Sequence, residues 1–364
     1  MRVLQISSSR TYGGGERHFV DLCRGLAARG HEVFAGIRPT NIWQDRLDYL
    51  PPENILHVSI RNSFGILSAT RIAAFAREKE IDIVHAHVAR DYIPASIACA
   101  LSGRAKFVLT RHVLFPLKPF NRLALTNLSM AIAVSPGVER SLQRIFPRNK
   151  VVVIPNGIDP PYPNGPAEIA KLRSEFRAYH QIPEDAYLIG TVGELTPLKG
   201  QRDLLLAANE IAAEFPDIRF IIVGRDNSAS QAFRRELKRL VRVLGLEDRS
   251  YWLDWVEDTK SLYAALDMFV SVSHTESFGM AILEAIGSGV PVIVTDTEGA
   301  RELVRDRGRR VPVGEPVKLA ERLRKAALDR DAERSAALSA MDEAVKTYSL
   351  DRMIERTERV YLEL

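Results

Sequence analysis

The segment "MFVSVSHTESFGMAILEAIGSGVPVIVTD" (268–296) contains the pattern from which the rest of the fold can be predicted. Residues 268–273 form a short apolar run typical of a buried strand, and residues 291–296 form another. Between them a loop, "HTE", leads into "SFGMAILEAIG", which is expected to begin a helix. Apolar strands that lack alternation and are separated by helices indicate a parallel sheet covered on both faces.

The same alternation of short apolar runs and helical patterns extends along the chain in both directions. Expected strands of the first half are residues 2–7, 32–37, 81–87, 106–110, 130–134 and 150–155, and those of the second half are residues 186–193, 219–224, 250–255, 268–273, 291–296 and 308–313. The proline- and Asn-Gly-rich stretch 154–165 separates the halves and is interpreted as a linker. We therefore predict an α/β protein with two doubly wound, Rossmann-like parallel-sheet domains facing a central cleft.

Length and composition agree with two domains. The 364 residues exceed the ~250–300 at which one core usually stops growing. The predicted boundaries are 1–160, 161–345, and a C-terminal helix over 346–364 that packs back on the first domain. No apolar run reaches the ~20 residues that cross a bilayer, and the two cysteines fit free core thiols, so a cytoplasmic protein is expected.

Charge is distributed unevenly along the chain. Residues 1–150 carry 21 Lys and Arg against 11 Asp and Glu, a net +10, whereas residues 151–364 carry 29 against 35, a net −6. This asymmetry favours an anionic partner for the first half, although surface charge can also drift without function. A nucleic-acid partner is not expected, because no base-reading motif accompanies the basic charge.

Two glutamates of the opening segment are the first candidates for a site. Glu276 precedes the expected helix and Glu284 lies two turns inside it, up to ~12 Å further along. Between them, the backbone N–H groups near Phe278 and Gly279 would face an anion at the start of the helix. The separation suits two ends of a sugar–diphosphate–ribose unit. The alternative is a solvated helix charge, which is hard to place among the apolar neighbours of Glu284.

Two further loops follow expected strands. In "TVGELTPLKGQRDLL" (191–205), Lys199 stands at a helix start, where a cation conflicts with the helix dipole unless an anion is bound. An exposed loop lysine is the alternative. In "SSSRTYGGGERHF" (7–19), three glycines allow close backbone approach to a phosphate, or form only a tight turn. This loop lacks the G-x-G-x-x-G fingerprint, which argues against a dehydrogenase.

Histidines follow two other strands, in "DIVHAH" (82–87) and "LTRHVLFP" (109–116). His112 is the better ligand candidate of the group. His85 and His87 alternate on a strand, so one of them is expected to face the core. No set of His, Cys and carboxylate has the spacing of a metal site, and we predict no bound metal and no cofactor.

Taken together, these residues resemble the retaining GT-B glycosyltransferases of family 4. The similar motifs run in order along the chain: "GGGE" (13–16), "DIVHAH" (82–87), "VSPGV" (134–138), "VIPNGID" (153–159), "VG" and "KG" (192–193 and 199–200) and "ESFGMAILE" (276–284). The resemblance implies a GT-B fold, a nucleotide-sugar donor held mainly by the C-terminal domain, and an acceptor held mainly by the N-terminal domain. It implies transfer with retention and without a metal.

The resemblance also assigns roles to residues. His112, Glu276 and Lys199 would be the catalytic set: His112 near the reacting carbon, Glu276 on the sugar hydroxyls, and Lys199 on the diphosphate. The implied donor-binding set is Gly14, Gly15, Glu194, Arg225, Phe278, Gly279, Met280 and Glu284, and the implied acceptor-binding set is Arg10, Glu16 and Arg111. Glu194 departs from the family, which commonly has arginine there. It is expected to turn away, to bind acceptor or ribose, or to be compensated by Arg225 or Arg202.

The sequence leaves the ligands open. UDP-sugars are favoured as donors, with GDP-mannose next, and the acceptor is a saccharide or lipid-linked saccharide of the cell envelope. Segment 102–129 mixes basic and aromatic residues, which suits an anionic membrane surface, or else is a core strand followed by a basic loop. A small-sugar synthase or phosphorylase, or a nucleotide-sugar-binding protein without turnover, remains an alternative. Oligomeric state is not predicted.

Overall fold

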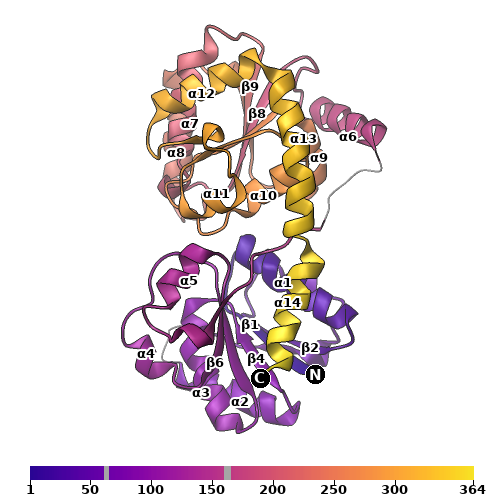
Figure 1. Cartoon of the computed structure of the whole chain (residues 1–364), viewed down its shortest axis with the longest axis vertical. Helices are drawn as coiled ribbons and strands as arrows, with labels where there is room; N and C mark the ends of the chain where they lie inside the picture. The colour runs from indigo at the N-terminus through magenta and orange to yellow at the C-terminus, as the bar shows by residue number, and fades with distance from the viewer. Residues whose placement is uncertain (61–64, 160–164) are drawn as a thin grey trace. The chain divides into compact units, whose positions relative to one another are not determined.

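The computed structural model describes residues 1–60, 65–159 and 165–364, which divide into two compact units (Figure 1). Unit 1 contains residues 1–157 and 350–364, and unit 2 contains residues 158–349. Part of the expected linker, residues 160–164, lies outside the described residues, as does the predicted domain boundary at 160/161.

Unit 1 is built on a seven-stranded sheet in the order β3-β2-β1-β4-β5-β6-β7, with parallel pairing throughout. Its strands are β1 Arg2–Ser7, β2 Glu32–Ile37, β3 Ile55–His57, β4 Ile83–Ala86, β5 Lys106–Arg111, β6 Leu128–Ala133 and β7 Val151–Val153. Its helices are α1 Gly14–Ala28, α2 Ile66–Glu78, α3 Tyr92–Ser102, α4 Asn121–Ala124, α5 Pro136–Leu142 and α14 Leu350–Leu362. The strand order reverses between β1 and β4, the place where doubly wound sheets bind ligands.

Unit 2 is built on a six-stranded parallel sheet in the order β10-β9-β8-β11-β12-β13. Its strands are β8 Tyr187–Val192, β9 Ile218–Val223, β10 Ser250–Leu253, β11 Met268–Ser271, β12 Val292–Thr295 and β13 Arg310–Val311. Its helices are α6 Pro166–Tyr179, α7 Gln201–Ala212, α8 Ala232–Val243, α9 Thr259–Ala265, α10 Met280–Gly287, α11 Glu298–Leu303, α12 Pro316–Leu328 and α13 Arg330–Thr347. Here the order reverses between β8 and β11, so the loops after these two strands are the expected ligand positions.

The C-terminal helix α14 belongs to unit 1 and lies beside α1 (Figure 1). Its apolar residues Met353, Ile354, Val360 and Tyr361 join the same core cluster as the buried face of α1. The two helices approach closely at Gly25, where an added Cβ would lie 2.0 Å from the Ile354 side chain. The helix thus extends the hydrophobic core of a domain whose other elements end some 200 residues earlier in the chain.

Candidate functional site

The loops that follow β8 and β11 in unit 2 are tied directly to each other. The backbone N–H of His274 donates to the Leu198 carbonyl at 2.8 Å. Gly200 adopts a left-handed conformation, φ +66°, and a Cβ built on it would lie 2.0 Å from the Val272 carbonyl oxygen. Only glycine satisfies both demands, so Gly200 allows the loop after β8 to reach the end of β11.

This approach brings two of the predicted site residues together. Lys199 Nζ donates to Glu276 Oε2 at 2.7 Å, and the Ser273 hydroxyl donates to the same oxygen at 3.2 Å. The Lys199 side chain is 33% exposed and that of Glu276 is 14% exposed. The expected conflict between Lys199 and the α7 dipole is therefore resolved within the protein, because the anion beside the lysine is the Glu276 carboxylate.

Helix α10 begins later than its apolar pattern suggests. Gly279 is its N-cap residue and Met280 its first helical residue, so Glu284 lies in the second turn rather than after two full turns. Phe278 is buried against Tyr348, and its backbone nitrogen lies close to Gly299 of α11. The first N–H groups of α10, which have no partner within the helix, begin at Met280.

The two glutamates have different partners. Glu284 is half-buried and accepts a hydrogen bond from the Tyr263 hydroxyl at 2.8 Å. Tyr263 comes from α9 and is buried. Glu276 is held by Lys199 and Ser273, as described above. Both carboxylates are thus fixed by neighbouring side chains that are also hydrogen-bond donors.

Glu194, which departs from the family pattern, is exposed and accepts from the Asn227 side-chain amide at 2.9 Å. Its backbone carbonyl accepts from the Gln201 side chain at 2.9 Å. Of the two arginines expected to compensate it, Arg202 pairs with Glu236 of α8 at 3.6 Å, and Arg225 is exposed. Glu194 is therefore directed to the loop after β9.

In unit 1 the glycine-rich segment forms the start of α1. Gly13 is the N-cap in extended conformation, and Gly14, Gly15 and Glu16 make the first turn. Gly15 lies beside the His112 ring, since a Cβ built there would be 3.7 Å from it. Arg10 is exposed in the preceding loop. The structure thus brings Gly15 and His112 together.

His112 is part of a histidine cluster in unit 1. The Nε2 atom of His112 lies 3.5 Å from Nδ1 of His87. The His18 ring, from α1, packs edge-on against the His112 ring, with the two ring centroids 4.8 Å apart. Burial lowers the pKa of His18 to about 4 and the pKa values of His87 and His112 well below the usual range. These imidazoles are therefore neutral at pH 7, and His112 offers hydrogen bonds without adding positive charge.

The expectation that only one of His85 and His87 faces the core is wrong. Both are buried, and their ring centroids lie 4.2 Å apart. Residues two apart on a strand share a face, and β4 ends at Ala86, just before His87. His85 contacts Thr110 Oγ1 at 2.7 Å, and its Nδ1 contacts the Tyr361 hydroxyl of α14.

Arg111, predicted to bind acceptor, is buried, and its guanidinium donates to the Phe115 carbonyl. The rest of segment 102–129 divides in two. Strand β5 is buried apart from its first residue, whereas the part that follows exposes large apolar side chains beside exposed Lys118 and Arg122. These exposed apolar residues are Val113, Phe115, Phe120 and Leu123. Among the described residues, every helix is too short or too polar to cross a bilayer.

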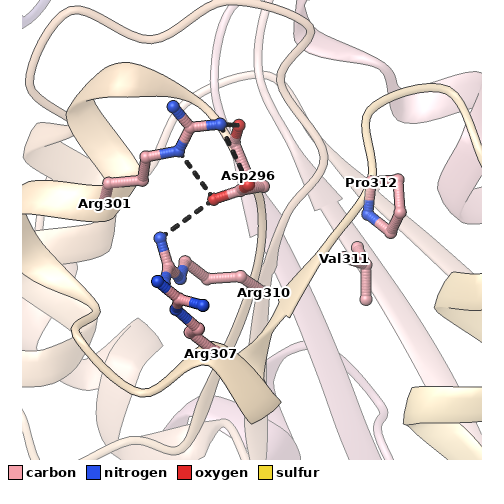
Figure 2. A pocket seen from close by; sticks show the side chains of 6 residues that line it. All are labelled: Asp296, Arg301, Arg307, Arg310, Val311 and Pro312. Atoms are coloured by element: carbon pink, nitrogen blue, oxygen red, sulfur yellow. Dashed lines mark hydrogen bonds and ion pairs between the residues drawn. The ribbon is translucent and has the colours of Figure 1, made fainter.

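A pocket of about 480 Å³ in unit 2 contains none of the predicted site residues. Figure 2 shows its lining side chains, which are Asp296, Arg301, Arg307, Arg310, Val311 and Pro312. Arg301 and then Arg310 hold the pKa of Asp296 below its usual value. The acid thus partly neutralises the arginines of this pocket.

Several residues around the site were not predicted. In unit 2 they are Ser273, which contacts Glu276 three residues further along, and Tyr263 and Asn227, whose partners lie 21 and 33 positions away. In unit 1 they are His18 and Asp91; Asp91 accepts from the Ser8 backbone at 2.8 Å, and burial raises its pKa to about 7. For His18 a signal existed, because it precedes Leu22 by one helical turn and so shares the buried face of α1.

Two family models match this chain, one in each of its two units. The Glycosyltransferase Family 4 model matches residues 12–161, and the Glycosyl transferases group 1 model matches residues 173–342. The lipopolysaccharide core biosynthesis glycosyltransferase LpsE of Rhizobium meliloti is 26% identical over 306 residues, 83% of this chain and 82% of the relative. N-acetyl-alpha-D-glucosaminyl L-malate synthase of Bacillus anthracis is 24% identical over 373 residues, 97% and 94% of the two chains.

Solved structures share the fold over the full length. Anabaena HepE in complex with UDP-glucose has a TM-score of 0.86 at 25% identity, covering 100% of both chains. A glycosyltransferase from Rickettsia africae has a TM-score of 0.85 at 24% identity, covering 100% of this chain and 98% of the other. The fold is therefore GT-B, and with two family models that together span most of the sequence, this chain belongs to the family 4 GT-B glycosyltransferases.

Proposed function

We propose that this chain transfers a hexose, with retention of configuration, from a nucleotide-sugar to a saccharide or lipid-linked acceptor of the cell envelope. The Lys199–Glu276 pair at the switch point of the unit 2 sheet carries this proposal, because it joins a cation suited to a diphosphate with a carboxylate suited to sugar hydroxyls. UDP-sugars are favoured over GDP-mannose, supported by the UDP and UDP-glucose complexes of HepE. The LpsE relative supports an envelope product.

The chemistry assigned to unit 2 is stabilisation of the leaving group. Lys199 and the N–H groups at the start of α10 would bear the charge that develops on the departing diphosphate. Glu276 would accept hydrogen bonds from sugar hydroxyls, and Glu284 from the ribose. The departing phosphate would itself take the proton of the acceptor hydroxyl, which is how transfer on one face gives retention. None of these steps requires a metal ion.

Unit 1 is assigned the acceptor, with Arg10 and Glu16 as candidate contacts. His112 is assigned to the donor sugar near the reacting carbon. Because its imidazole is neutral, it would position a hydroxyl rather than repel or attract charge. Gly15 beside it leaves the ring edge open to a ligand that a larger residue would block.

The first experiment is a thermal-shift titration of the full chain with UDP, GDP, ADP and their common sugars. A nucleotide at 100 times its Kd stabilises the folded state by about 2.7 kcal/mol, which corresponds to roughly 5–10 °C for a unit of this size. Lys199→Ala should abolish most of that shift and lower turnover about 100-fold or more. Lys318→Ala, which removes another ion-paired lysine of unit 2, is the matched control and should bind normally.

Outcomes of this titration separate the alternatives. A shift with one nucleotide, no product with any sugar acceptor, and activity gained by Glu194→Arg would favour a binding protein without turnover. That alternative has one supporting observation, the Glu194 carboxylate held by Asn227 in place of the family arginine. No shift with any nucleotide would overturn the proposed donor site altogether.

We also propose that the exposed apolar and basic residues after β5 meet an anionic membrane surface where a lipid-linked acceptor resides. Leu123 is 80% exposed and adjoins Arg122 on α4. The wild-type chain should sediment with vesicles that contain anionic lipid at low salt. The Leu123→Ser variant should stay in the supernatant. Leu328→Ser, which changes a leucine of unit 2 that is 72% exposed, should leave binding intact. Equal sedimentation of both variants would contradict the proposal.

A further inference from the structure

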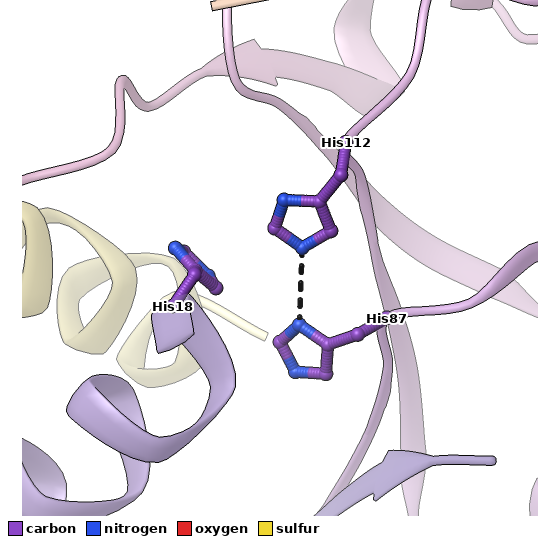
Figure 3. A group of neighbouring side chains, drawn as sticks. All are labelled: His18, His87 and His112. Carbon is purple, nitrogen blue, oxygen red and sulfur yellow. Dashed lines mark hydrogen bonds between the residues drawn. The ribbon is translucent and has the colours of Figure 1, made fainter. Parts of the chain in front are cut away.

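Three histidines from separate elements of unit 1 converge on one point, as Figure 3 shows. His18 comes from α1, His87 follows β4, and His112 follows β5. One ring nitrogen from each lies within 4.8 Å of the others. The spacing of these residues along the chain gives no hint of this arrangement, which depends on the switch between β1 and β4.

One edge of this triangle already has the dimensions of a metal site. His87 Nδ1 and His112 Nε2 are 3.5 Å apart. A tetrahedral ion bound about 2.0–2.1 Å from each nitrogen places them about 3.3–3.4 Å apart. To complete the site, His18 would have to approach by on the order of 1 Å.

A buried hydrogen-bond chain directs the lone pair of His87 to this point. The Gln5 amide donates from Nε2 to the Tyr361 hydroxyl at 3.1 Å, and its Oε1 lies 2.7 Å from His87 Nε2. Since a carbonyl oxygen only accepts, His87 Nε2 carries the hydrogen and Nδ1 carries the lone pair. Histidines that bind metals usually donate their other N–H to such an oxygen, which holds the ring in place.

His18 supplies the second indication. It is 3% exposed, and among the described residues neither of its ring nitrogens has a partner at full hydrogen-bond geometry, although the neighbouring Asn156 side chain interacts with the ring and favours its protonated form. A buried polar group without a well-formed hydrogen bond is unfavourable, and a bound ion would give the His18 lone pair a partner. All three rings are neutral at pH 7, so binding does not first require a proton to be lost from an imidazolium.

We propose that His18, His87 and His112 bind one divalent transition-metal ion of the zinc type, with a fourth position for water or a small oxygen ligand. Three imidazoles with an open position suit Zn²⁺ and its borderline neighbours, whereas Mg²⁺ and Ca²⁺ require oxygen ligands. His112 is only partly buried, which leaves the fourth position on its side. The ion is not needed for transfer. By occupying His112 it would block the contact assigned to the donor sugar, so Zn²⁺ would act as an inhibitor.

The test uses the full chain stripped with a chelator and no nucleotide-sugar, so it is independent of the proposed function. Zn²⁺ competition against a chromophoric chelator should give one tight site per chain. His18→Asn should weaken it by about 10–100-fold or more, the loss that even an outer partner of a ligand causes when removed. His57→Asn, which changes an exposed histidine of β3, is the matched control and should leave the affinity unchanged.

A second measurement does not depend on any variant folding. Co²⁺ bound in place of Zn²⁺ should give the intense visible absorption of a four-coordinate ion with nitrogen ligands, and Zn²⁺ should bleach it. A pale six-coordinate spectrum, no stoichiometric binding, or equal Zn²⁺ affinity in wild type and folded His18→Asn would overturn the proposal.

Discussion

Acid should destabilise unit 1 through its buried imidazoles. In the unfolded chain a histidine takes up a proton near pH 6.5, whereas burial keeps His18 neutral in the folded unit down to a pKa of about 4. The unfolded state therefore binds more protons between these two values. The stability that neutral His18 provides is complete above pH 6.5, decreases as the pH falls through this window, and is lost below about pH 4.

The magnitude follows from the same two pKa values. At pH 5 the unfolded state binds a proton at His18 and the folded state does not, which lowers the free energy of unfolding by about 2 kcal/mol. Burial also holds the pKa values of His85, His87 and His112 well below the usual range, so these three groups act in the same direction as His18. Asp91 acts in the opposite sense, because burial raises its pKa to about 7 in the folded state. Acidification from pH 7.5 to 5 protonates the buried carboxyl group and so raises the free energy of unfolding by roughly 2–3 kcal/mol. The His18 contribution is therefore measured as a difference between two variants, in which the effect of Asp91 cancels.

The assay is differential scanning calorimetry of the full chain, with a chelator present, at pH 7.5 and pH 5.0. For a domain of this size, 2 kcal/mol corresponds to about 4–8 °C in Tm. The loss of Tm on acidification should thus be about 4–8 °C smaller in His18→Asn than in wild type, and unchanged in His57→Asn. Groups elsewhere in the molecule cancel in this comparison. If wild type and His18→Asn lose the same Tm, burial does not keep His18 neutral, and the reasoning fails.

Three further predictions concern single contacts. Gly200→Ala should lower the Tm of unit 2 far more than Gly245→Ala. Both glycines have left-handed φ, but the Cβ added at Gly200 would lie 2.0 Å from the Val272 carbonyl oxygen, whereas the Cβ added at Gly245 would meet no atom within 4 Å. Tyr361→Phe should destabilise unit 1 by about 1–3 kcal/mol for each buried group left unpaired, measured by denaturant unfolding, whereas an unchanged midpoint would show that the hydroxyl is dispensable. Glu276→Gln should lower kcat while changing stability by only about 0–1 kcal/mol, since its lysine partner is a third exposed; a large drop in Tm would make any loss of activity uninformative.

The fold could be predicted because its strands are apolar on both faces and are separated by helices. Strands 2–7 and 32–37 have the bounds that their apolar runs predict. Strand β3 was missed because it has only three residues, directly after a proline turn. Several other expected strands run too long at their carboxyl ends. There the chain leaves the sheet while it is still apolar, and the residues just beyond, such as His87 and Ser273, belong to the site.

The positions of candidate site residues could be predicted for a related reason. In parallel sheets every strand ends at the same edge, so residues after strands are the right ones to consider. Their partners could not be predicted. Tyr361 reaches His85 and Gln5 from the other end of the chain, and only the packing of α14 on α1 brings it there. Periodicity shows that α14 has a buried face, but not which sheet residues that face meets.

The Lys199–Glu276 pair could be predicted only in part from the sequence. A lysine at a helix start correctly indicates that an anion must be near, but it does not say whether that anion belongs to a ligand or to the protein. The structure supplies a carboxylate from a loop 77 positions away, through the close approach that Gly200 permits. This pairing also changes what binding a diphosphate would require. The ligand must share or displace Glu276 at Lys199 Nζ, and the released carboxylate then has the sugar hydroxyls as its replacement donors. Donor binding on this account is an exchange of partners within one ion pair, so a nucleotide without its sugar should bind less tightly than the intact nucleotide-sugar.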